Sequence, residues 1–430
     1  MVPFRYLNIH SPWYDSDKEA TWVEPIREYL TNEDVWLSKN TMLLGQVKVT
    51  PTAVDPLSGL DSVSGNYHAI VGHAKVRGRA VPTPSNNSAK WMTTTGAVTI
   101  ENYTDSKAGY KGQFHHTLAA ILVDVDEEGY AHIRHVHFNG DGFYDLDRFV
   151  TPDGIDIGHR IAALICGDIH VKFIDSTVRR VTFGRSEESM LSTLRPHQLG
   201  IHDLLDFYSD SHHARGNDLE DYSRWAYHRG NVEKEFQESA DFLDELCGQM
   251  DGTIHVIPSN HNEHADRWLS ETNTNMIRAE NRQLFHWLKF HQYDQMKCTP
   301  EGYETISAFQ FWCENPVLEP GLTNPGGKIQ FHYRGESLMI AGIECGLHGD
   351  VGPNGARGST LNIARMGSKT VVGHSHFPEI FEGCYKVGLS AMIPLNYTVG
   401  QPSSWLHTHC IIYPDGKRTL IHIANGGYRA

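Results

Sequence analysis

The sequence predicts a mixed α/β protein, and three observations carry this prediction. Residues 64–150 are rich in strand-like segments, which Gly, Pro and Asn residues separate. After residue 160, short apolar runs alternate with longer helical patterns, as in a layered domain with buried strands. Between these two parts, the segment 151–159 has the composition of a linker. We therefore expect a β-rich accessory domain over 1–155 and an α/β domain over 156–430.

Individual elements follow from local patterns. In the first part, a short helix is expected over 22–30, and strands are expected within 67–81, 96–103, 114–126 and 130–138. In the second part, apolar runs at 160–166, 253–258, 337–344 and 369–373 predict buried strands. A helical insertion is expected over about 217–295, because this block contains long amphipathic stretches such as 231–250.

Composition narrows the class of protein. The 430 residues carry a formal net charge of −15, whereas a protein that coats nucleic acid is basic, so any contact with nucleic acid must be local. No apolar run approaches the roughly 20 residues that span a bilayer. The N-terminus lacks the basic flank and apolar block of a secretion signal. We expect no membrane segment and a cytoplasmic location.

Polar clusters that suit metal binding follow the apolar runs. Ligands collect beyond the carboxyl ends of strands in α/β sheets, and four of the five clusters plainly follow a strand-like run. A single histidine in such a place is more often structural than a ligand, but five clusters in order favour a shared site. The candidate side chains are Asp168, His170, Asp203, Asn260, His261, His348, His374 and His376.

The order of the motifs resembles the signature of calcineurin-like metallophosphoesterases. The motifs are GDIH at 167–170, HDLLD at 202–206, SNH at 259–261, GLH at 346–348 and GHSH at 373–376. The resemblance covers about 160–430, and it implies a layered β-sandwich core flanked by helices.

The same resemblance implies two divalent cations and a role for each motif residue. The first cation would be bound by Asp168, His170, Asp203 and His376. The second cation would be bound by Asp203, Asn260, His348 and His374. A catalytic histidine that is not itself a ligand would be His261. A ligand set of oxygen and nitrogen without thiolate suits manganese, iron or zinc, and the nuclease branch of the family favours manganese.

The sequence departs from the family pattern near the catalytic histidine. His202 and Ser259 replace glycines, and Asn262 stands where an acidic residue often orients the catalytic imidazole. Two other carboxylates, those of Asp206 and Glu263, are candidates for that supporting role.

A narrower resemblance points to a substrate. The segments 92–116, 209–213 and 349–359 are similar to parts of large, early-expressed nucleases of tailed phages, which degrade host DNA. This resemblance implies DNA as the substrate and the host cytoplasm as the location. The acidic composition favours the alternative, a phosphatase or phosphodiesterase acting on a small nucleotide or a phosphoprotein. A degenerate member that binds without catalysis is a third interpretation, but all the metal positions are filled.

Several residues are candidates for substrate contact. Lys75, Arg77 and Arg79 alternate along a predicted strand and could grip phosphates from one face, with a solvated sheet face as the competing interpretation. Arg357 and Ser359 belong to a glycine-rich loop that could approach the scissile phosphate or form a plain turn.

Two further expectations come from the stretch between the second and third motifs. His213 follows the second motif closely and could contact substrate, with a helix surface as the competing interpretation. Apolar helix faces within 217–295 could serve self-association, so we also expect a homo-oligomer.

Overall fold

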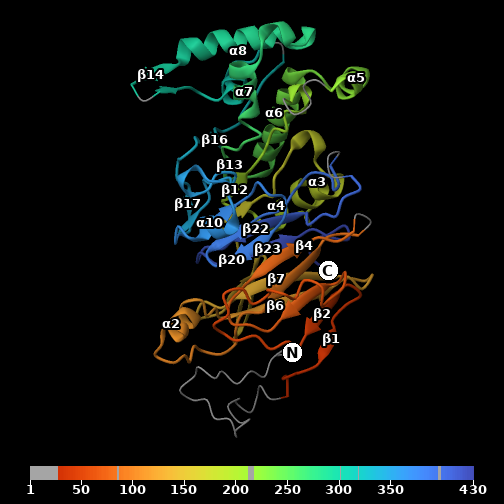
Figure 1. Ribbon diagram of the computed structural model, residues 1–430, viewed down its shortest axis with the longest axis vertical. Coiled ribbons are helices and arrows are strands. Elements are labelled where there is room, and N and C mark those ends of the chain that lie inside the picture. Colours follow the sequence, from red (N-terminus) through yellow and green to blue (C-terminus); the bar gives the residue numbers. More distant parts are fainter. Residues whose placement is uncertain (1–27, 85–86, 212–216, 301, 318, 396–398) are drawn as a thin grey trace.

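The protein is a mixed α/β structure with several sheets (Figure 1). The computed structural model describes residues 28–84, 87–211, 217–300, 302–317, 319–395 and 399–430. Its two largest sheets have six and ten strands. The helix expected over 22–30 lies mostly outside the described residues, and the three described residues at its end form no helix.

The six-stranded sheet forms from apolar runs of the second half of the chain. Its order is β16-β13-β12-β11-β22-β23, in which the first four strands are parallel, β22 is antiparallel to β11, and β23 is antiparallel to β22. The parallel strands are short and apolar, as expected for strands covered on both faces. The bounds are β11 (Ala163–Ile165), β12 (Gln198–Ile201), β13 (Thr253–Val256), β16 (Ile329–Phe331), β22 (Thr408–Ile412) and β23 (Arg418–His422).

Helices cover one face of this sheet. A core cluster joins sheet residues such as Leu199 and Ile254 to helix residues such as Leu243, Trp268 and Trp312, all nearly fully buried. The helices that contribute to this cluster are α3 (Ser176–Phe183), α4 (Met190–Leu194), α6 (Val232–Gln249), α7 (His264–Glu271), α8 (Arg282–Gln295) and α9 (Ala308–Glu314), whereas α5 (Asp218–Ala226) contributes no residue to it. The block expected to be helical, 217–295, contains α5 to α8, which lie toward one end of the molecule in Figure 1.

The ten-stranded sheet draws on both halves of the chain. Its order is β1-β2-β3-β5-β4-β20-β21-β19-β18-β17. The early strands are β1 (Asp34–Trp36), β2 (Thr41–Leu44), β3 (His68–Val71), β4 (Gly78–Val81) and β5 (Lys90–Thr94). The late strands are β17 (Met339–Ile340), β18 (Ile343–Glu344), β19 (Thr370–Val372), β20 (Glu379–Phe381) and β21 (Cys384–Lys386).

This sheet crosses the boundary expected at residue 155. The antiparallel pairing of β4 with β20 places Arg79 opposite Glu379, so strands from residues 34–94 continue the sheet formed by residues 339–386. The two large sheets also share a core, since one buried cluster contains Ile70 and Trp91 from one sheet and Ile165 from the other. Residues on either side of the expected boundary are thus packed together, and a domain border there stays a prediction.

Smaller elements complete the described chain. A two-stranded ladder lies against β23, and a three-stranded sheet follows it in sequence. These strands are β6 (Ala119–Val125), β7 (Ala131–His137), β8 (Phe143–Asp145), β9 (Arg148–Thr151) and β10 (Gly154–Ile157), and a hairpin comprises β14 (Lys297–Thr299) and β15 (Gly302–Glu304). The remaining helices are α2 (Lys107–Phe114), α10 (Thr360–Ala364), η1 (Val171–Phe173), η2 (Tyr208–Asp210), η4 (Thr274–Met276), η5 (Ala279–Asn281) and η6 (Pro353–Gly355).

One expected strand is absent from the described chain. Residues 96–103 show the alternation of a strand, but they form only isolated bridges at Gly96 and Ala97. Val98 and Ile100 are exposed, so this segment has no buried face against which a strand would pack. Sequence alternation was therefore misleading here.

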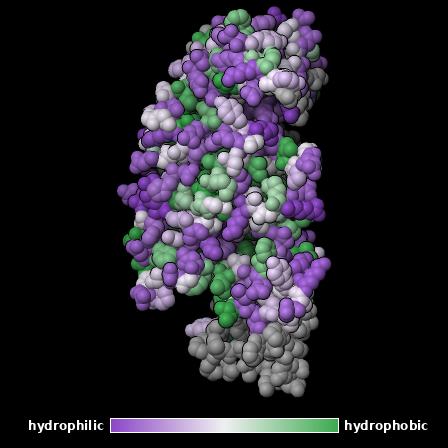
Figure 2. Space-filling model, turned by 90° about the vertical axis from the view of Figure 1, so that its left-hand side faces the viewer, coloured by the Kyte–Doolittle hydropathy of each residue, from purple (hydrophilic) through white to green (hydrophobic). Residues whose placement is uncertain are grey.

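The described helices were compared with the length and apolar character of a membrane span. None of them is both long and apolar enough to cross a bilayer. On the face that Figure 2 presents, hydrophobic residues are interspersed among hydrophilic ones. Leu219, Tyr222 and Trp225 are exposed on α5, and self-association through such residues stays a prediction.

Three histidines with lowered pKa values predict an acid-sensitive fold. Burial lowers the pKa of His68 and His135 to about 4 and that of His422 to about 3. Because these values lie below the ordinary 6.5, the unfolded chain binds more protons than the folded chain below pH 6.5. The contribution of these histidines to the free energy of unfolding is therefore fully present above pH 6.5. It is lost as the pH falls toward 4, at about 1.4 kcal/mol for each histidine and each pH unit.

Thermal unfolding of metal-free protein between about pH 7.5 and pH 5 measures this loss. A His68→Asn variant keeps an acceptor for the Trp91 N–H, which His68 Nδ1 accepts at 2.8 Å. The free energy of unfolding of this variant should depend on pH less steeply, because about one proton fewer is taken up on unfolding. An unchanged slope in this variant would contradict the assignment of His68.

Candidate metal centre

Three loops that follow parallel strands meet at one edge of the six-stranded sheet. β11, β12 and β13 are neighbours, and the loops beginning at Gly167, His202 and Ser259 lie beyond their carboxyl ends. A backbone hydrogen bond joins the first two loops, in which the His170 N–H donates to the Asp203 carbonyl at 2.7 Å. This edge is where an α/β sheet gathers ligands.

The ten-stranded sheet brings the remaining candidates to the same place. β18 leads to His348, and β19 leads to His374 and His376. The Gly373 N–H donates to the His348 carbonyl at 2.7 Å, which joins the two loops. The imidazole rings of His348 and His374 have centroids 5.2 Å apart.

One set of donors, the first donor group, comprises Asp168, His170, Asp203 and His376. His170 Nε2 lies 3.3 Å from His376 Nε2 and 3.7 Å from Asp203 Oδ2. His376 Nε2 lies 3.4 Å from Asp168 Oδ2. One ligand atom from each of His170, Asp203 and His376 thus lies within 4.8 Å of the others, close enough to hold a metal ion.

A second donor group, Asp203, Asn260, His348 and His374, adjoins the first. His348 Nε2 lies 3.3 Å from Asp203 Oδ2 and 3.0 Å from Asn260 Oδ1. His374 Nδ1 lies 3.0 Å from the same Asn260 oxygen. Asp203 belongs to both donor groups, so its carboxylate stands between them. The structure therefore brings together all seven side chains that the sequence nominated as ligands.

The two buried carboxylates provide a test of whether this cluster fits a cation. Asp168 and Asp203 are fully buried, and within the described residues none of their carboxylate oxygens accepts a hydrogen bond. Burial and the neighbouring Asp203 raise the pKa of Asp168 to about 7. Leaving buried charge without donors is costly unless a cation compensates it. These His and Asp groups could therefore bind a metal ion.

The imidazoles around the carboxylates differ in their affinity for protons. Burial alone would lower the pKa of His170, but the nearby Asp206 and Asp203 carboxylates raise it to about 9. Burial lowers the pKa of His374 to about 4, with a contribution from His348. His374 is therefore neutral at neutral pH, which is the form in which an imidazole binds a metal.

The backbone at this cluster is strained. His170, Asp203, His374 and His376 have φ values of 46°, 45°, 75° and 61°, in the left-handed region that side chains with a Cβ rarely adopt. Such conformations cost about 1–3 kcal/mol each and persist where the surroundings enforce them. Their concentration in four of the seven candidate ligands is typical of a functional site.

Asp206 supports two histidines of the cluster. Its Oδ1 lies 3.1 Å from His170 Nδ1 and 3.7 Å from His261 Nδ1. The backbone carbonyl of Asp206 also lies 3.2 Å from His261 Nδ1. The His261 side chain is 22% exposed, so it is accessible to solvent beside the buried ligands. Of the two carboxylates considered for orienting His261, Asp206 is the one in contact with it.

Glu263 has a different partner. Arg334 Nε lies 2.5 Å from Glu263 Oε1, and Arg334 Nη1 lies 3.0 Å from Asp350 Oδ1. Glu263 follows His261 by two residues and Asp350 follows His348 by two residues, so Arg334 connects the loops that carry these histidines. Sequence analysis did not identify Arg334, because no motif or spacing links it to either loop.

Two other neighbours of the cluster were not predicted. His202 is buried, with its Nδ1 3.4 Å from His348 Nδ1. Burial and His348 lower its pKa to about 3, so it is neutral. The ring of Trp405 lies edge-on to His376, with centroids 4.6 Å apart. The sequence marks His202 only as a replacement for a glycine of the family pattern, and no local pattern indicates Trp405.

The predicted basic row is engaged inside the protein. Arg77 pairs with Asp55 at 3.2 Å and with Glu379 at 3.0 Å, and Arg79 Nη1 also lies 3.5 Å from Asp55. Lys75 is buried and donates to a backbone carbonyl at 3.0 Å. These contacts bind a preceding loop to the ten-stranded sheet. A role for the row in gripping phosphates stays a prediction that this arrangement does not favour.

The remaining candidates for substrate contact are Arg357, Ser359 and His213. Ser359 caps α10, where its hydroxyl accepts the Asn362 N–H at 3.2 Å. Arg357 is exposed in a loop whose ends are joined by the Gly358 N–H donating to the Asp350 carbonyl at 2.9 Å. The loop therefore begins near His348. His213 lies outside the described residues.

We predict that Gly373→Ala removes bound metal. A Cβ at this position would lie 2.3 Å from Asp168 Oδ1, so the carboxylate would have to move. Displacing a ligand in this way should weaken metal affinity by about 10–100-fold, measured as metal content by mass spectrometry. Gly248→Ala is the matched control, because nothing lies within 4 Å of a Cβ there. Normal metal content in Gly373→Ala would contradict the prediction.

We also predict opposite effects of Asp168→Asn on the metal-free and metal-loaded protein. The substitution removes a buried charge that accepts no hydrogen bond, so the metal-free protein should be at least as stable as the parent. The thermal stabilisation produced by added manganese should disappear, because the ligand is lost. Melting temperatures with and without manganese test both effects, with the exposed Asp153→Asn as control. Undiminished stabilisation by manganese would exclude Asp168 as a ligand.

Comparison with known proteins places the chain in a family. No family model matches it. The chain is 31% identical over 416 residues to Protein A1 of Escherichia phage T5, an alignment that covers 94% of this chain and 72% of that protein. The similarity extends over most of both chains and suggests a bacteriophage protein. The chain belongs to the family of Protein A1 of Escherichia phage T5.

Proposed function

We propose that this protein is a metal-dependent phosphodiesterase that hydrolyses DNA, built as a calcineurin-like metallophosphoesterase with a layered β-sandwich core. The observation that carries the proposal is the position of Asp203. Its carboxylate is fully buried, accepts no hydrogen bond within the described residues and stands between two donor groups. Asp203 would therefore be a ligand shared by two cations.

The donor groups assign ligands to two cations. The first donor group would hold one ion and the second donor group the other, with Asp203 common to both. All these donors are oxygen or imidazole nitrogen, which suits manganese, with iron and zinc as alternatives. When bound, a pair of divalent cations supplies Lewis acidity toward the oxygens of a phosphodiester.

His261 is suited to act on the substrate. Donation from its Nδ1–H to the Asp206 carbonyl, 3.2 Å away, leaves Nε2 as the nitrogen that exchanges protons. From beside the cluster, Nε2 could contact a phosphoryl oxygen or hold a proton at the leaving oxygen. Burial lowers the pKa of His261, so the free protein holds this imidazole neutral near pH 7.

DNA is the proposed substrate because of two separate resemblances. Segments 92–116, 209–213 and 349–359 resemble early nucleases of tailed phages, and the chain belongs to a phage protein family. The net charge of −15 requires that DNA be held locally, by the cations and a few basic groups. In this proposal the enzyme acts in the host cytoplasm.

The substrate class is tested with plasmid DNA and manganese. We expect loss of intact plasmid, and no loss after the metal is removed with a chelator. A small bis-phosphodiester is assayed in parallel. Intact plasmid beside rapid hydrolysis of the small compound would replace DNA with a small nucleotide as the substrate.

His261→Ala should separate catalysis from metal binding. We expect turnover of DNA to fall by about 10²–10⁴-fold, because a group that transfers a proton contributes on that order. Bound metal should stay at the parental level, since His261 is not assigned as a ligand. His286→Ala, at an exposed position on α8, is the control for loss of an imidazole. Equal losses of metal and turnover would make His261 a ligand instead.

A further inference from the structure

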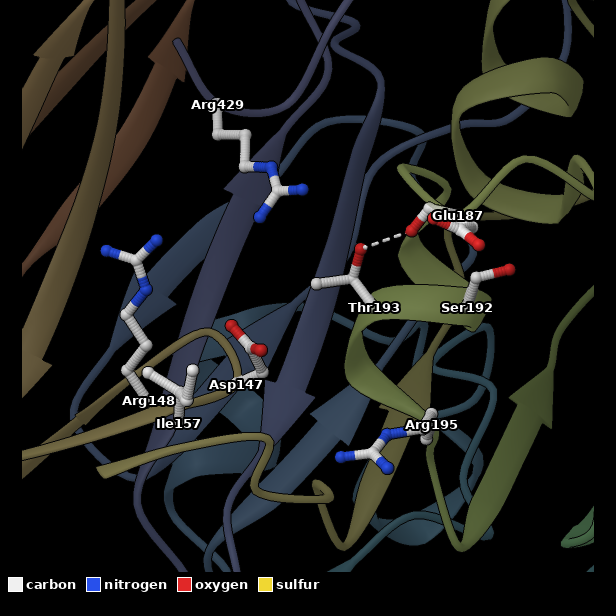
Figure 3. Close-up of a pocket in the computed structure, with 8 residues that line it drawn as sticks. All are labelled: Asp147, Arg148, Ile157, Glu187, Ser192, Thr193, Arg195 and Arg429. Carbon is white, nitrogen blue, oxygen red and sulfur yellow. Dashed lines mark hydrogen bonds between the residues drawn. The ribbon is translucent and has the colours of Figure 1, made fainter. Parts of the chain in front are cut away.

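A pocket outside the donor cluster is lined by three arginines, which are residues that bind anions. Its volume is about 480 Å³, and its walls come from the β8–β9 turn, the end of β10, α4 with the loop before it, and the C-terminus. Figure 3 shows Arg148, Arg195 and Arg429 on different sides of this pocket, with Asp147 among them.

The arginines of the pocket are not neutralised by ion pairs. In the part of the chain that the structure describes, no carboxylate forms a salt bridge with Arg148, Arg195 or Arg429, whereas Arg77, Arg134 and Arg334 elsewhere each pair with two carboxylates. One guanidinium nitrogen of Arg195 donates to the Gly158 carbonyl. The remaining guanidinium N–H groups are therefore available to a ligand.

Two carboxylates limit the positive charge of the pocket. Asp147 and Glu187 line it together with the three arginines, so three positive and two negative charges leave a net charge of +1. The hydroxyl of Thr193 donates to the Glu187 carbonyl at 3.2 Å and belongs to the same wall. Such a mixture favours a ligand that accepts several hydrogen bonds from guanidinium groups.

The pocket lies at the opposite edge of the six-stranded sheet from the donor cluster. Arg195 comes shortly before β12 begins at Gln198, and the donor Asp203 comes shortly after β12 ends at Ile201. Ile157 likewise precedes β11, whereas Asp168 follows it. The strands themselves separate the two places, so the pocket is not part of the proposed catalytic site.

We propose that this pocket binds a phosphate group, carried by a free nucleotide or by the backbone of a nucleic acid. A guanidinium presents paired N–H donors that match the oxygens of a phosphate, and arginines from separate segments can surround one such group. The volume of about 480 Å³ accommodates more than phosphate alone, so the rest of a nucleotide has room beside it. The proposal does not depend on hydrolysis at the donor cluster.

Binding is measured by calorimetry on protein stripped of metal. The chelator is removed first, because a polycarboxylate would compete for the arginines. Without metal, the buried carboxylates of the donor cluster repel anions, so that site does not contribute. The probes are inorganic phosphate, deoxyadenosine monophosphate and a short single-stranded oligonucleotide.

Substitutions in the pocket should change affinity in opposite directions. Arg148→Gln and Arg429→Gln should each weaken binding by about tenfold or more, because each loses a charge-assisted hydrogen bond. Asp147→Asn should strengthen binding, since it removes a repelling charge. Arg365→Gln is the control, because Arg365 is exposed and the only described hydrogen bond of its side chain is to Asn362. Melting temperatures establish that each variant is folded.

The probes distinguish the source of the phosphate. Binding of the mononucleotide, displaced by inorganic phosphate, identifies a site for a free nucleotide. Binding of the oligonucleotide alone identifies a contact for a nucleic-acid backbone. Failure of all three probes to bind, or binding that the Arg148 and Arg429 substitutions leave unchanged, would overturn the proposal. Plasmid hydrolysis by the same variants tests the proposed catalytic activity separately, so a failure of either proposal can be told from a failure of the other.

Discussion

The burial of two carboxylates without hydrogen-bond donors is the constraint around which the second half of this protein is arranged. Asp168 and Asp203 lie where loops from two sheets meet, and neither carboxylate accepts a hydrogen bond among the described residues. Charge in such a place destabilises a fold unless a cation accompanies it. The surrounding imidazoles and the Asn260 amide oxygen supply the further ligands that a cation needs. A metal ion bound here would therefore stabilise the fold.

The structure around these carboxylates is arranged to hold them in place. Four residues of the cluster adopt left-handed backbone conformations, and a glycine at position 373 leaves room for the Asp168 carboxylate. Asp206 contacts both His170 and His261, so one carboxylate links a proposed ligand to the proposed catalytic group. Rigid support of this kind determines how accurately a site positions its reacting groups.

The described arginines of this acidic protein differ in whether they form ion pairs. Arg77 and Arg79 are committed to internal ion pairs that join a loop to the ten-stranded sheet. Arg148 and Arg429, by contrast, have no ion pair in the described chain and line an open pocket. The arginines that line the pocket therefore lie outside the basic row that the sequence suggested. Local placement of charge matters more here than the net value of −15.

The sequence by itself determined the alternation of strands and helices and the order of the metal-binding motifs, because apolar periodicity and strand-end polar residues are local properties. It nominated seven ligands, and the structure brings them into one cluster. Only the tertiary structure decided which carboxylate contacts His261, that Arg334 joins two loops, and that Lys75, Arg77 and Arg79 face carboxylates and carbonyls. It also decided that strands from both halves share one sheet. These features depend on pairings between residues distant in sequence, which no local pattern records.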